Sequence, residues 1–195
     1  MRVISGNNKG KKLKTLAGEK VRPTSDRIKE ALFNLIEIKP DMVVLDLFAG
    51  TGNVGIEALS RGAFSTTFIE NSKKVFNILR RNVHDCKLES KSILFRGDVY
   101  DCLKVLNKKN KNYDLIFADP PYDRGHVKKL LSNENLVKVI DDSGTIILEH
   151  SPRELSVIEG LDDETRPKPS NWQLIKCRKY GNTCISILKL DTEKG

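Results

Sequence analysis

The sequence predicts an α/β protein with a mostly parallel sheet, and three observations lead to this fold class. Short apolar runs alternate with helical stretches between residues 42 and 150, which is the pattern of parallel strands joined by helices. The runs are continuously apolar, as in MVVLDLF (42–48), which is typical of strands covered on both faces. The chain then reads as two strands around Gly181-Asn182. We therefore expect a seven-stranded sheet with helices on both faces and a C-terminal antiparallel hairpin.

Each expected element follows from a local pattern of apolar, glycine and capping residues. The expected strands are residues 42–48, 65–70, 92–98, 113–119 and 144–150, followed by the hairpin at 172–188. The expected helices between them are residues 54–61, 72–86, about 100–108 and 125–140.

The first 40 residues read as an extension in front of this α/β domain. In RPTS (22–25), Thr24 or Ser25 is a typical helix N-cap, and the apolar spacing that follows predicts a helix over 26–36. Residues 2–20 mix β-like pieces with glycines, which predicts a short basic hairpin or an irregular arm. We therefore divide the chain into an N-terminal basic arm and helix, 1–40, and an α/β domain, 41–190.

The charge of the chain is concentrated at its N-terminus. The 195 residues carry a net charge of +8, and residues 1–40 hold ten Lys or Arg against four acids, so +6 lies there. A basic segment of this kind favours a polyanionic partner, with a solvated basic face as the alternative. Lys9, Lys11 and Lys12 are the candidate phosphate contacts in this arm.

The cysteines, histidines and hydropathy indicate which kinds of protein are not expected. The four cysteines show no CxxC spacing and the three histidines are scattered, so we expect reduced thiols, a cytoplasmic protein and no metal site. No apolar stretch approaches 18 residues and the N-terminus has no apolar h-region. We therefore expect neither a membrane span nor a signal peptide.

A glycine-rich turn after the first α/β strand predicts a nucleotide-type cofactor site. Gly50-x-Gly52-x-x-Gly55 follows that strand and opens a helix, and Glu70 ends the next strand 20 residues after Gly50. Glycine lets the backbone approach a ligand closely, and a carboxylate at the next strand end can accept both hydroxyls of a ribose. This pattern alone fits either a dinucleotide or S-adenosylmethionine.

Two further acids favour S-adenosylmethionine. Asp46 lies at the end of the first strand, where a carboxylate suits the amino group of a methionine moiety and would repel a pyrophosphate. Asp98 follows the third strand in RGDV, where it can accept from an adenine amino group or cap the next helix. Asp46, Glu70 and Asp98 therefore suit a ligand that is cationic and bears hydroxyl and amino groups.

The motif FADPPY (117–122) ends the fourth strand and predicts chemistry on an amine. The exocyclic amine of a nucleobase is a poor nucleophile, because its lone pair is delocalised into the ring. Asp119 and the Pro120 carbonyl can accept hydrogen bonds from that amine on a rigid backbone, and rigidity matters for a near-attack geometry. Tyr122 offers a ring on which a flipped-out base can stack.

Three stretches resemble one known family. DLFAGTG (46–52) resembles motif I of the class I S-adenosylmethionine-dependent methyltransferases, and DPPY (119–122) resembles the motif of amine-directed N-methyltransferases. Together with RPTSDRIKEALFN (22–34), they resemble the RsmD-type bacterial rRNA methyltransferases, which methylate a guanine N2 in 16S rRNA. The resemblance extends to KYGNT (179–183) and so covers nearly the whole chain.

This resemblance implies a fold, a reaction and a set of site residues. It implies a Rossmann-like class I fold, S-adenosylmethionine as the cofactor, and the 16S rRNA of the small ribosomal subunit or its assembly intermediate as the partner. The implied catalytic residues are Asp119, Pro120, Pro121 and Tyr122. The implied cofactor-binding residues are Asp46, Phe48, Gly50, Gly52, Glu70, Asp98 and Val99. The implied RNA-binding residues are Arg22, Thr24, Asp26, Arg27, Lys9, Lys11 and Lys12, in an arm where relatives often carry arginine instead of lysine.

The residues also leave other functions open. Methylation of adenine N6 in DNA or RNA fits DPPY equally well, and methylation of a glutamine amide fits it less well because of the basic arm. An NAD-dependent oxidoreductase would use the glycine-rich turn but leaves DPPY and Asp46 unexplained. An RNA-binding module without activity would not need four acids at the strand ends. We expect a monomeric methyltransferase.

Overall fold

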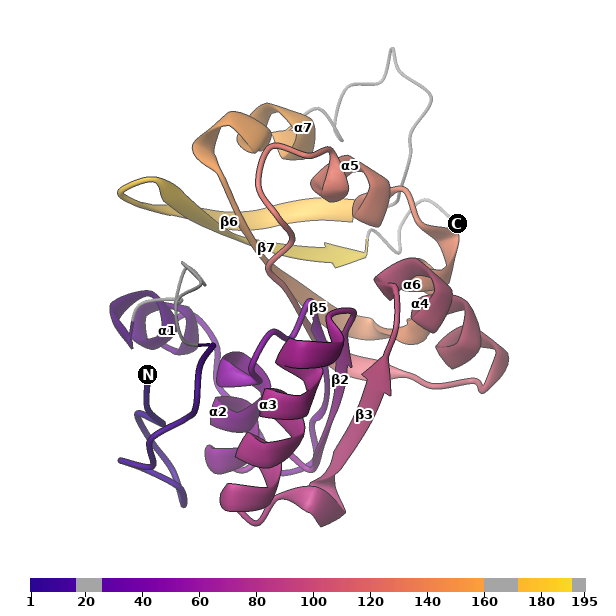
Figure 1. Cartoon of the computed structure of the whole chain (residues 1–195). Helices are drawn as coiled ribbons and strands as arrows, with labels where there is room; N and C mark the ends of the chain where they lie inside the picture. The colour runs from indigo at the N-terminus through magenta and orange to yellow at the C-terminus, as the bar shows by residue number, and fades with distance from the viewer. Residues whose placement is uncertain (17–25, 160–171, 191–195) are drawn as a thin grey trace. The chain divides into compact units, whose positions relative to one another are not determined.

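The protein is described here from a computed structural model that covers residues 1–16, 26–159 and 172–190 (Figure 1). The chain forms two compact units, Met1–Val99 and Tyr100–Gly195. The first contains the glycine-rich turn, and the second contains DPPY.

The first unit is built on three parallel strands. These are β1 (Val43–Leu47), β2 (Ser65–Glu70) and β3 (Ser92–Arg96), in the order β3-β2-β1. The helices that follow β1 and β2 pack against these strands: α2 (Asn53–Ser60) and α3 (Lys73–Asp85). A short 3₁₀ helix, η1 (Glu89–Lys91), precedes β3, and α4 (Val99–Lys108) begins two residues after Gly97. The carboxyl ends of β1 and β2 therefore lie at the same edge of the sheet as the start of α2.

The N-terminal arm is held by side chains instead of by a strand partner. The expected short hairpin is present as one antiparallel bridge, Arg2–Lys12, with backbone hydrogen bonds that join residues 1–3 to residues 10–13. The Glu57 carboxylate on α2 accepts hydrogen bonds from the backbone N–H groups of Ile4 (2.7 Å) and Ser5 (2.9 Å). Further along, Asn82 on α3 accepts from the Lys14 N–H and donates to the Lys14 carbonyl. The backbone of the arm is thus fixed while its lysines stay exposed.

A buried ion pair joins the arm, the first helix and α2. The first helix, α1 (Asp26–Phe33), carries Lys29, whose Nζ lies 3.2 Å from Glu57 Oε2 with both side chains fully buried. The ammonium also donates to the Arg2 carbonyl and to Asn53 Oδ1. Burial lowers the pKa of Lys29, and the charge of Glu57 opposes that shift. A buried ion pair of this kind offsets the cost of burying its two charges only while its hydrogen bonds are all made.

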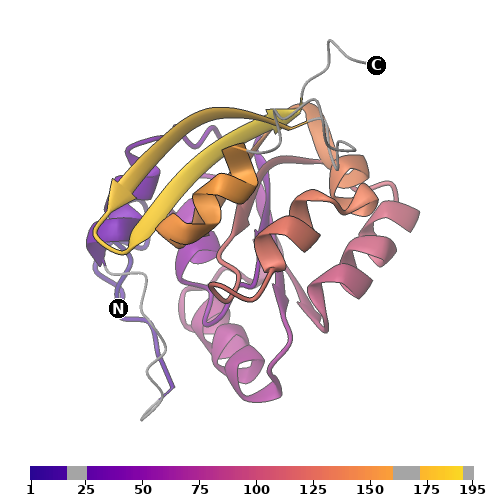
Figure 2. The ribbon, with the colours of Figure 1, turned by 90° about the horizontal axis from the view of Figure 1, so that it is seen from above.

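The second unit combines two parallel strands with the C-terminal hairpin. The strands β4 (Tyr113–Ala118) and β5 (Ile140–His150) are parallel, and β5 pairs antiparallel with β7 (Thr183–Leu190). Strand β6 (Trp172–Tyr180) completes the hairpin, seen as the long curved pair of strands in Figure 2. The helices of this unit are α4 from its second residue onward, α5 (His126–Leu131), α6 (Glu134–Val139), the 3₁₀ helix η2 (Pro152–Glu154) and α7 (Leu155–Glu159).

The strand order of the seven-stranded sheet is β3-β2-β1-β4-β5-β7-β6. Strands β1 to β3 are parallel to one another, as are β4 and β5, and the last two strands form the antiparallel hairpin around Gly181-Asn182. The expected fold class, a mostly parallel α/β sheet closed by an antiparallel hairpin, is confirmed.

Some element boundaries differ from the expected ones for local reasons. The helix expected at 125–140 is two helices, because the Asn133 side chain caps α6 by accepting from the N–H groups of Asn135 and Leu136. Strand β5 begins at Ile140, which pairs with Tyr113 ahead of a register shift. Strand β3 ends at Arg96, so Asp98 lies immediately before α4 and not within the strand. Helix α1 ends at Phe33, and its expected caps, Thr24 or Ser25, lie outside the described residues.

Within residues 1–16, 26–159 and 172–190, no helix is long and apolar enough to cross a membrane.

The buried Lys29–Glu57 pair gives a test of how the arm is held. Lys29→Met should lower the free energy of unfolding by about 3 kcal/mol, because it removes the fully buried one of the two cations that pair with Glu57 and leaves only Arg61. Chemical denaturation measures the change. Glu30→Gln is the matched control, since Glu30 is the exposed neighbour on the same helix, and its effect should stay within about 0.5 kcal/mol. Equal stability of the two variants would contradict this role.

Candidate active site

The glycine-rich turn after β1 contains three residues with positive φ angles, two of which are glycines. Phe48, Gly50 and Gly52 all have positive φ angles, of 59°, 55° and 87°, a region that favours glycine. Gly52 is the N-cap residue of α2, and a Cβ there would lie 2.5 Å from a methyl group of Leu79. A Cβ on Gly55 would lie 2.9 Å from Asp46 Oδ2 and still closer to the Phe68 ring. The turn is therefore packed tightly between β1, β2 and α3.

Asp46 fixes this turn from the end of β1. Its side chain is buried, with the residue only 4% exposed, and Oδ2 accepts a hydrogen bond of 2.9 Å from the Gly55 N–H in the first turn of α2. Burial raises the pKa of Asp46 to about 7, while the Gly55 hydrogen bond opposes the shift. A cationic group nearby would stabilise its charged form.

Glu70 closes the same site from the end of β2. Its Oε2 accepts from the Gly50 N–H (3.0 Å) and its Oε1 accepts from the Ser72 N–H (2.6 Å). Burial raises the pKa of Glu70, and these backbone hydrogen bonds partly offset that effect. Each carboxylate oxygen has a second lone pair, so both can still accept hydroxyl groups.

The remaining cofactor candidates, Asp98 and Val99, follow β3, which pairs with β2 so that Arg96 lies opposite Glu70. The Gly97 N–H donates to the Glu70 carbonyl oxygen at 3.1 Å. Asp98 follows as an exposed residue, and Val99 is the buried first residue of α4. The first unit thus brings Asp46, Gly50 and Glu70 together. Asp98 is the residue after Gly97, whose N–H contacts the Glu70 carbonyl.

In the second unit, DPPY forms the loop after β4. Asp119 and Pro121 are exposed, and Pro120 is buried. The Tyr122 hydroxyl donates to Glu149 Oε1 at 2.8 Å and lies 3.3 Å from Thr183 Oγ1. Burial and then the charge of Glu149 raise the pKa of Tyr122 far above its ordinary value. Tyr122 is therefore a neutral ring whose orientation is set by β5 and β7.

The residue after the motif is held by a second pair of contacts. Asp123 has a positive φ of 57°, and its N–H donates to Glu154 Oε1 at 3.2 Å. Its Oδ1 accepts from the Ser151 hydroxyl at 2.6 Å, and Glu154 Oε2 accepts in turn from the Ser151 N–H. Five side chains therefore anchor the carboxyl end of the DPPY loop: Asp123, Glu149, Ser151, Glu154 and Thr183.

Sequence reasoning missed all five of these anchors, including Asp123, which directly follows the motif. Glu149, Ser151, Glu154 and Thr183 were not among the candidate residues, although all four are buried polar groups. A weak signal for one of them exists, since Glu149 interrupts the otherwise apolar run TIILEH (145–150). The others become visible only when the hairpin and η2 are placed beside the loop.

The candidate RNA-binding residues are described only in part. Lys9, Lys11, Lys12 and Arg27 are exposed, and Asp26 Oδ2 lies 3.6 Å from the Arg2 guanidinium. Arg22 and Thr24 lie outside the described residues. Among the residues that the structure describes, no group of three or more His, Cys, Asp or Glu side chains is arranged to hold a metal ion.

Comparison with known proteins places this fold in a class. The solved structure of the Escherichia coli protein yhhF superposes with a TM-score of 0.77, at 26% identity and over 98% of both chains. The Bacillus subtilis protein YlbH is 36% identical over 97% of this chain and 98% of its own length. Ribosomal RNA small subunit methyltransferase D of Buchnera aphidicola is 35% identical over 89% of this chain and 85% of its own length. The fold is that of the class I methyltransferases.

The family model described as conserved hypothetical protein 95 matches residues 1–189. The chain belongs to this family, and the RsmD-type family expected from RPTSDRIKEALFN and DPPY is confirmed.

The anchoring of Tyr122 can be tested without any assumption about function. Tyr122→Phe should lower the free energy of unfolding by about 1–2 kcal/mol, because the buried Glu149 carboxylate loses its hydroxyl donor. Tyr180→Phe is the matched control, since no described residue hydrogen-bonds the Tyr180 hydroxyl. Thermal and urea unfolding give both values. A Tyr122→Phe variant as stable as the Tyr180→Phe variant would show that the hydroxyl does not anchor the loop.

Proposed function

We propose that this protein transfers a methyl group from S-adenosylmethionine to the exocyclic N2 of a guanine in the 16S rRNA of the small ribosomal subunit. The observation that carries the proposal is the DPPY loop, whose tyrosine is locked by Glu149 and Thr183 directly after a parallel strand. Support for the RNA substrate comes from the small subunit methyltransferase D relative, which is similar over most of both chains.

The donor set of the first unit suits S-adenosylmethionine. Glu70 would accept the ribose hydroxyls with its free lone pairs, and Asp98 would accept the adenine amino group. Asp46 would face the amino group of the methionine moiety, with Phe48, Gly50, Gly52 and Val99 lining the same site. When bound, S-adenosylmethionine supplies a methyl group on a positively charged sulfur. Asp46 fits the cationic amino group, because a nearby cation lowers the pKa that burial has raised.

The DPPY loop would hold and orient the amine. Asp119 and the Pro120 carbonyl accept hydrogen bonds from the exocyclic NH₂, and Tyr122 stacks on the base. Tyr122 does not act as a base in this scheme, since its raised pKa keeps it protonated. The amine loses a proton to Asp119 or to water after the new N–C bond forms. The loop therefore contributes mainly orientation, which its anchors make rigid.

The N-terminal arm would supply attraction to RNA. Lys9, Lys11 and Lys12 are exposed on a backbone that Glu57 and Asn82 hold in place. Lysine acts as a point charge on phosphate, so the arm adds affinity more than base selectivity. Arg22, Thr24, Asp26 and Arg27 are proposed to lie beside the bound RNA and cofactor.

The role of Asp119 is tested by Asp119→Ala with labelled S-adenosylmethionine and small-subunit particles from cells that lack the gene. We expect kcat to fall by about 100-fold or more, because the amine loses its charged acceptor, while cofactor affinity changes less than about twofold. Asp142→Ala removes an exposed carboxylate at the start of β5, outside the DPPY loop, and should keep full activity. If Asp119→Ala retains most of its activity with cofactor still bound, the assigned role of Asp119 is wrong. Absence of label in the RNA with wild-type protein would overturn the proposed substrate.

The raised pKa of Asp46 predicts how cofactor binding depends on pH. A protonated Asp46 cannot pair with the cationic amino group, so affinity for S-adenosylhomocysteine should fall as the pH drops below 7. The loss can approach about tenfold per pH unit between about pH 7 and pH 5.5. Asp46→Asn keeps an acceptor for the Gly55 N–H but cannot ionise, so its slope should be shallower, with Glu70 responsible for what remains. Calorimetric titration at both pH values measures the slopes, and equal slopes would exclude Asp46 from this contact.

A further inference from the structure

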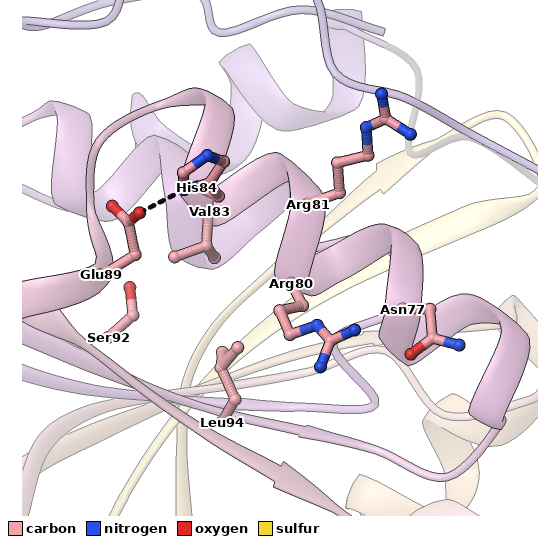
Figure 3. A pocket seen from close by; sticks show the side chains of 8 residues that line it. All are labelled: Asn77, Arg80, Arg81, Val83, His84, Glu89, Ser92 and Leu94. Atoms are coloured by element: carbon pink, nitrogen blue, oxygen red, sulfur yellow. Dashed lines mark hydrogen bonds and ion pairs between the residues drawn. The ribbon is translucent and has the colours of Figure 1, made fainter.

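The outer face of the first unit carries a pocket between α3 and β3 that the proposed reaction does not use. It has a cavity volume of about 660 Å³. Figure 3 shows its side chains, with the His84–Glu89 pair at one end and Asn77 at the other. The lining residues are Asn77, Arg80, Arg81, Val83, His84, Glu89, Ser92 and Leu94.

The cationic side chains of this pocket are not neutralised by its acids. Within the described residues, neither Arg80 nor Arg81 lies within 4.0 Å of a carboxylate oxygen, whereas the two nearby acids already have partners. Asp85 Oδ2 is 2.8 Å from Lys14 Nζ, and Glu89 Oε1 is 2.6 Å from His84 Nδ1. Arg80 extends over the pocket beside Leu94, while Arg81 points away from it (Figure 3). The guanidinium of Arg80 is therefore available to an anionic ligand.

The floor of the pocket combines apolar and unsatisfied polar groups. Val83 is buried and Leu94 is partly exposed, so the floor is apolar. Ser92 Oγ is buried and has no hydrogen-bond partner among the residues that the structure describes. Because β3 is the edge strand of the sheet, no further strand among residues 1–16, 26–159 and 172–190 pairs with it on this side. A buried hydroxyl without a partner is uncommon in folded proteins, so Ser92 is a polar group at this floor with hydrogen-bonding capacity to spare.

The pocket continues the basic surface of the N-terminal arm. The Lys14–Asp85 contact joins the arm to the last turn of α3. Residues 73–89 add five Lys or Arg against two acids, and all five of these cations are exposed. A polyanion bound to the arm lysines would meet this helix next. The charge pattern therefore favours a nucleic acid over an apolar partner.

We propose that the α3–β3 pocket binds one unpaired nucleotide of the RNA substrate, at a distance from the nucleotide that is methylated. The phosphate pairs with Arg80, the base packs on Leu94 and Val83, and Asn77 and Ser92 hydrogen-bond to its edge. Sequence-selective RNA recognition uses unstacked bases of this kind. The proposal rests on RNA as the substrate of the proposed function, and it gives the protein a second contact that selects the RNA region.

The test compares Arg80→Gln with Lys108→Gln, which removes one exposed charge from α4 outside the pocket. With small-subunit particles as substrate, Arg80→Gln should raise KM by about five- to tenfold and leave kcat within about twofold. It should also reduce the slope of log affinity against log salt by about one. Asn77→Ala should raise KM by about two- to threefold, and Lys108→Gln should have less effect than either.

Equilibrium binding of small-subunit RNA by filter retention separates this proposal from the proposed function, because binding needs no turnover. If the wild-type protein does not methylate the RNA but binds it with an affinity that depends on Arg80, RNA binding at the pocket is supported and the proposed methylation is contradicted. Equal KM and equal RNA affinity for Arg80→Gln and Lys108→Gln overturn the pocket. Full recovery by Arg80→Lys, with no effect of Asn77→Ala, would reduce the site to a phosphate contact and overturn nucleotide binding. Arg80-dependent binding of a polyglutamate peptide but not of RNA would assign the pocket to an acidic protein partner.

Discussion

The hydrogen bond from the Gly55 N–H to the Asp46 carboxylate is the constraint on which the first unit depends. It ties the end of β1 to the first turn of α2, and the residues between them must then turn through three positive φ angles. The same bond requires a residue without a Cβ at position 55, because a Cβ there would collide with Asp46 and Phe68. Strand, turn and helix are therefore fixed relative to one another before any ligand is present, which is the preorganisation that a tight cofactor site needs.

Buried or partly buried carboxylates recur in this protein as acceptors that hold irregular backbone or loops. Glu57 receives two N–H groups of the arm, Glu70 receives two at the cofactor turn, and Glu154 receives two beside the DPPY loop. A charged acceptor makes a stronger hydrogen bond than a neutral one, and irregular segments have no strand partner to satisfy their N–H groups. The segments proposed to contact RNA, cofactor and base are thus rigid for the same physical reason.

The sequence predicted the parts of the fold that depend on local patterns. Alternation of apolar strands with helices, the turn at Gly50 and Gly52, and the hairpin at Gly181-Asn182 all have short-range signals, and the structure agrees with them. The break between α5 and α6 was missed because Asn133 reads as an ordinary polar residue until its side chain caps a helix. The roles of Glu149 and Thr183 were missed because they depend on β5 and β7 lying beside the loop, which no local pattern encodes.

The chemistry of the DPPY loop is suited to an exocyclic amine, whichever base carries it. Guanine N2 is therefore the part of the proposal that the geometry of the loop does not select, whereas the similarity to a ribosomal RNA small subunit methyltransferase supports RNA as the substrate. The most direct test incubates the purified protein with methyl-labelled S-adenosylmethionine and small-subunit particles from cells lacking the gene, then digests the RNA to nucleosides. The account predicts label in N2-methylguanosine. Label in N6-methyladenosine would keep the methyltransferase and contradict the proposed base, and label in no nucleoside would contradict RNA as the substrate.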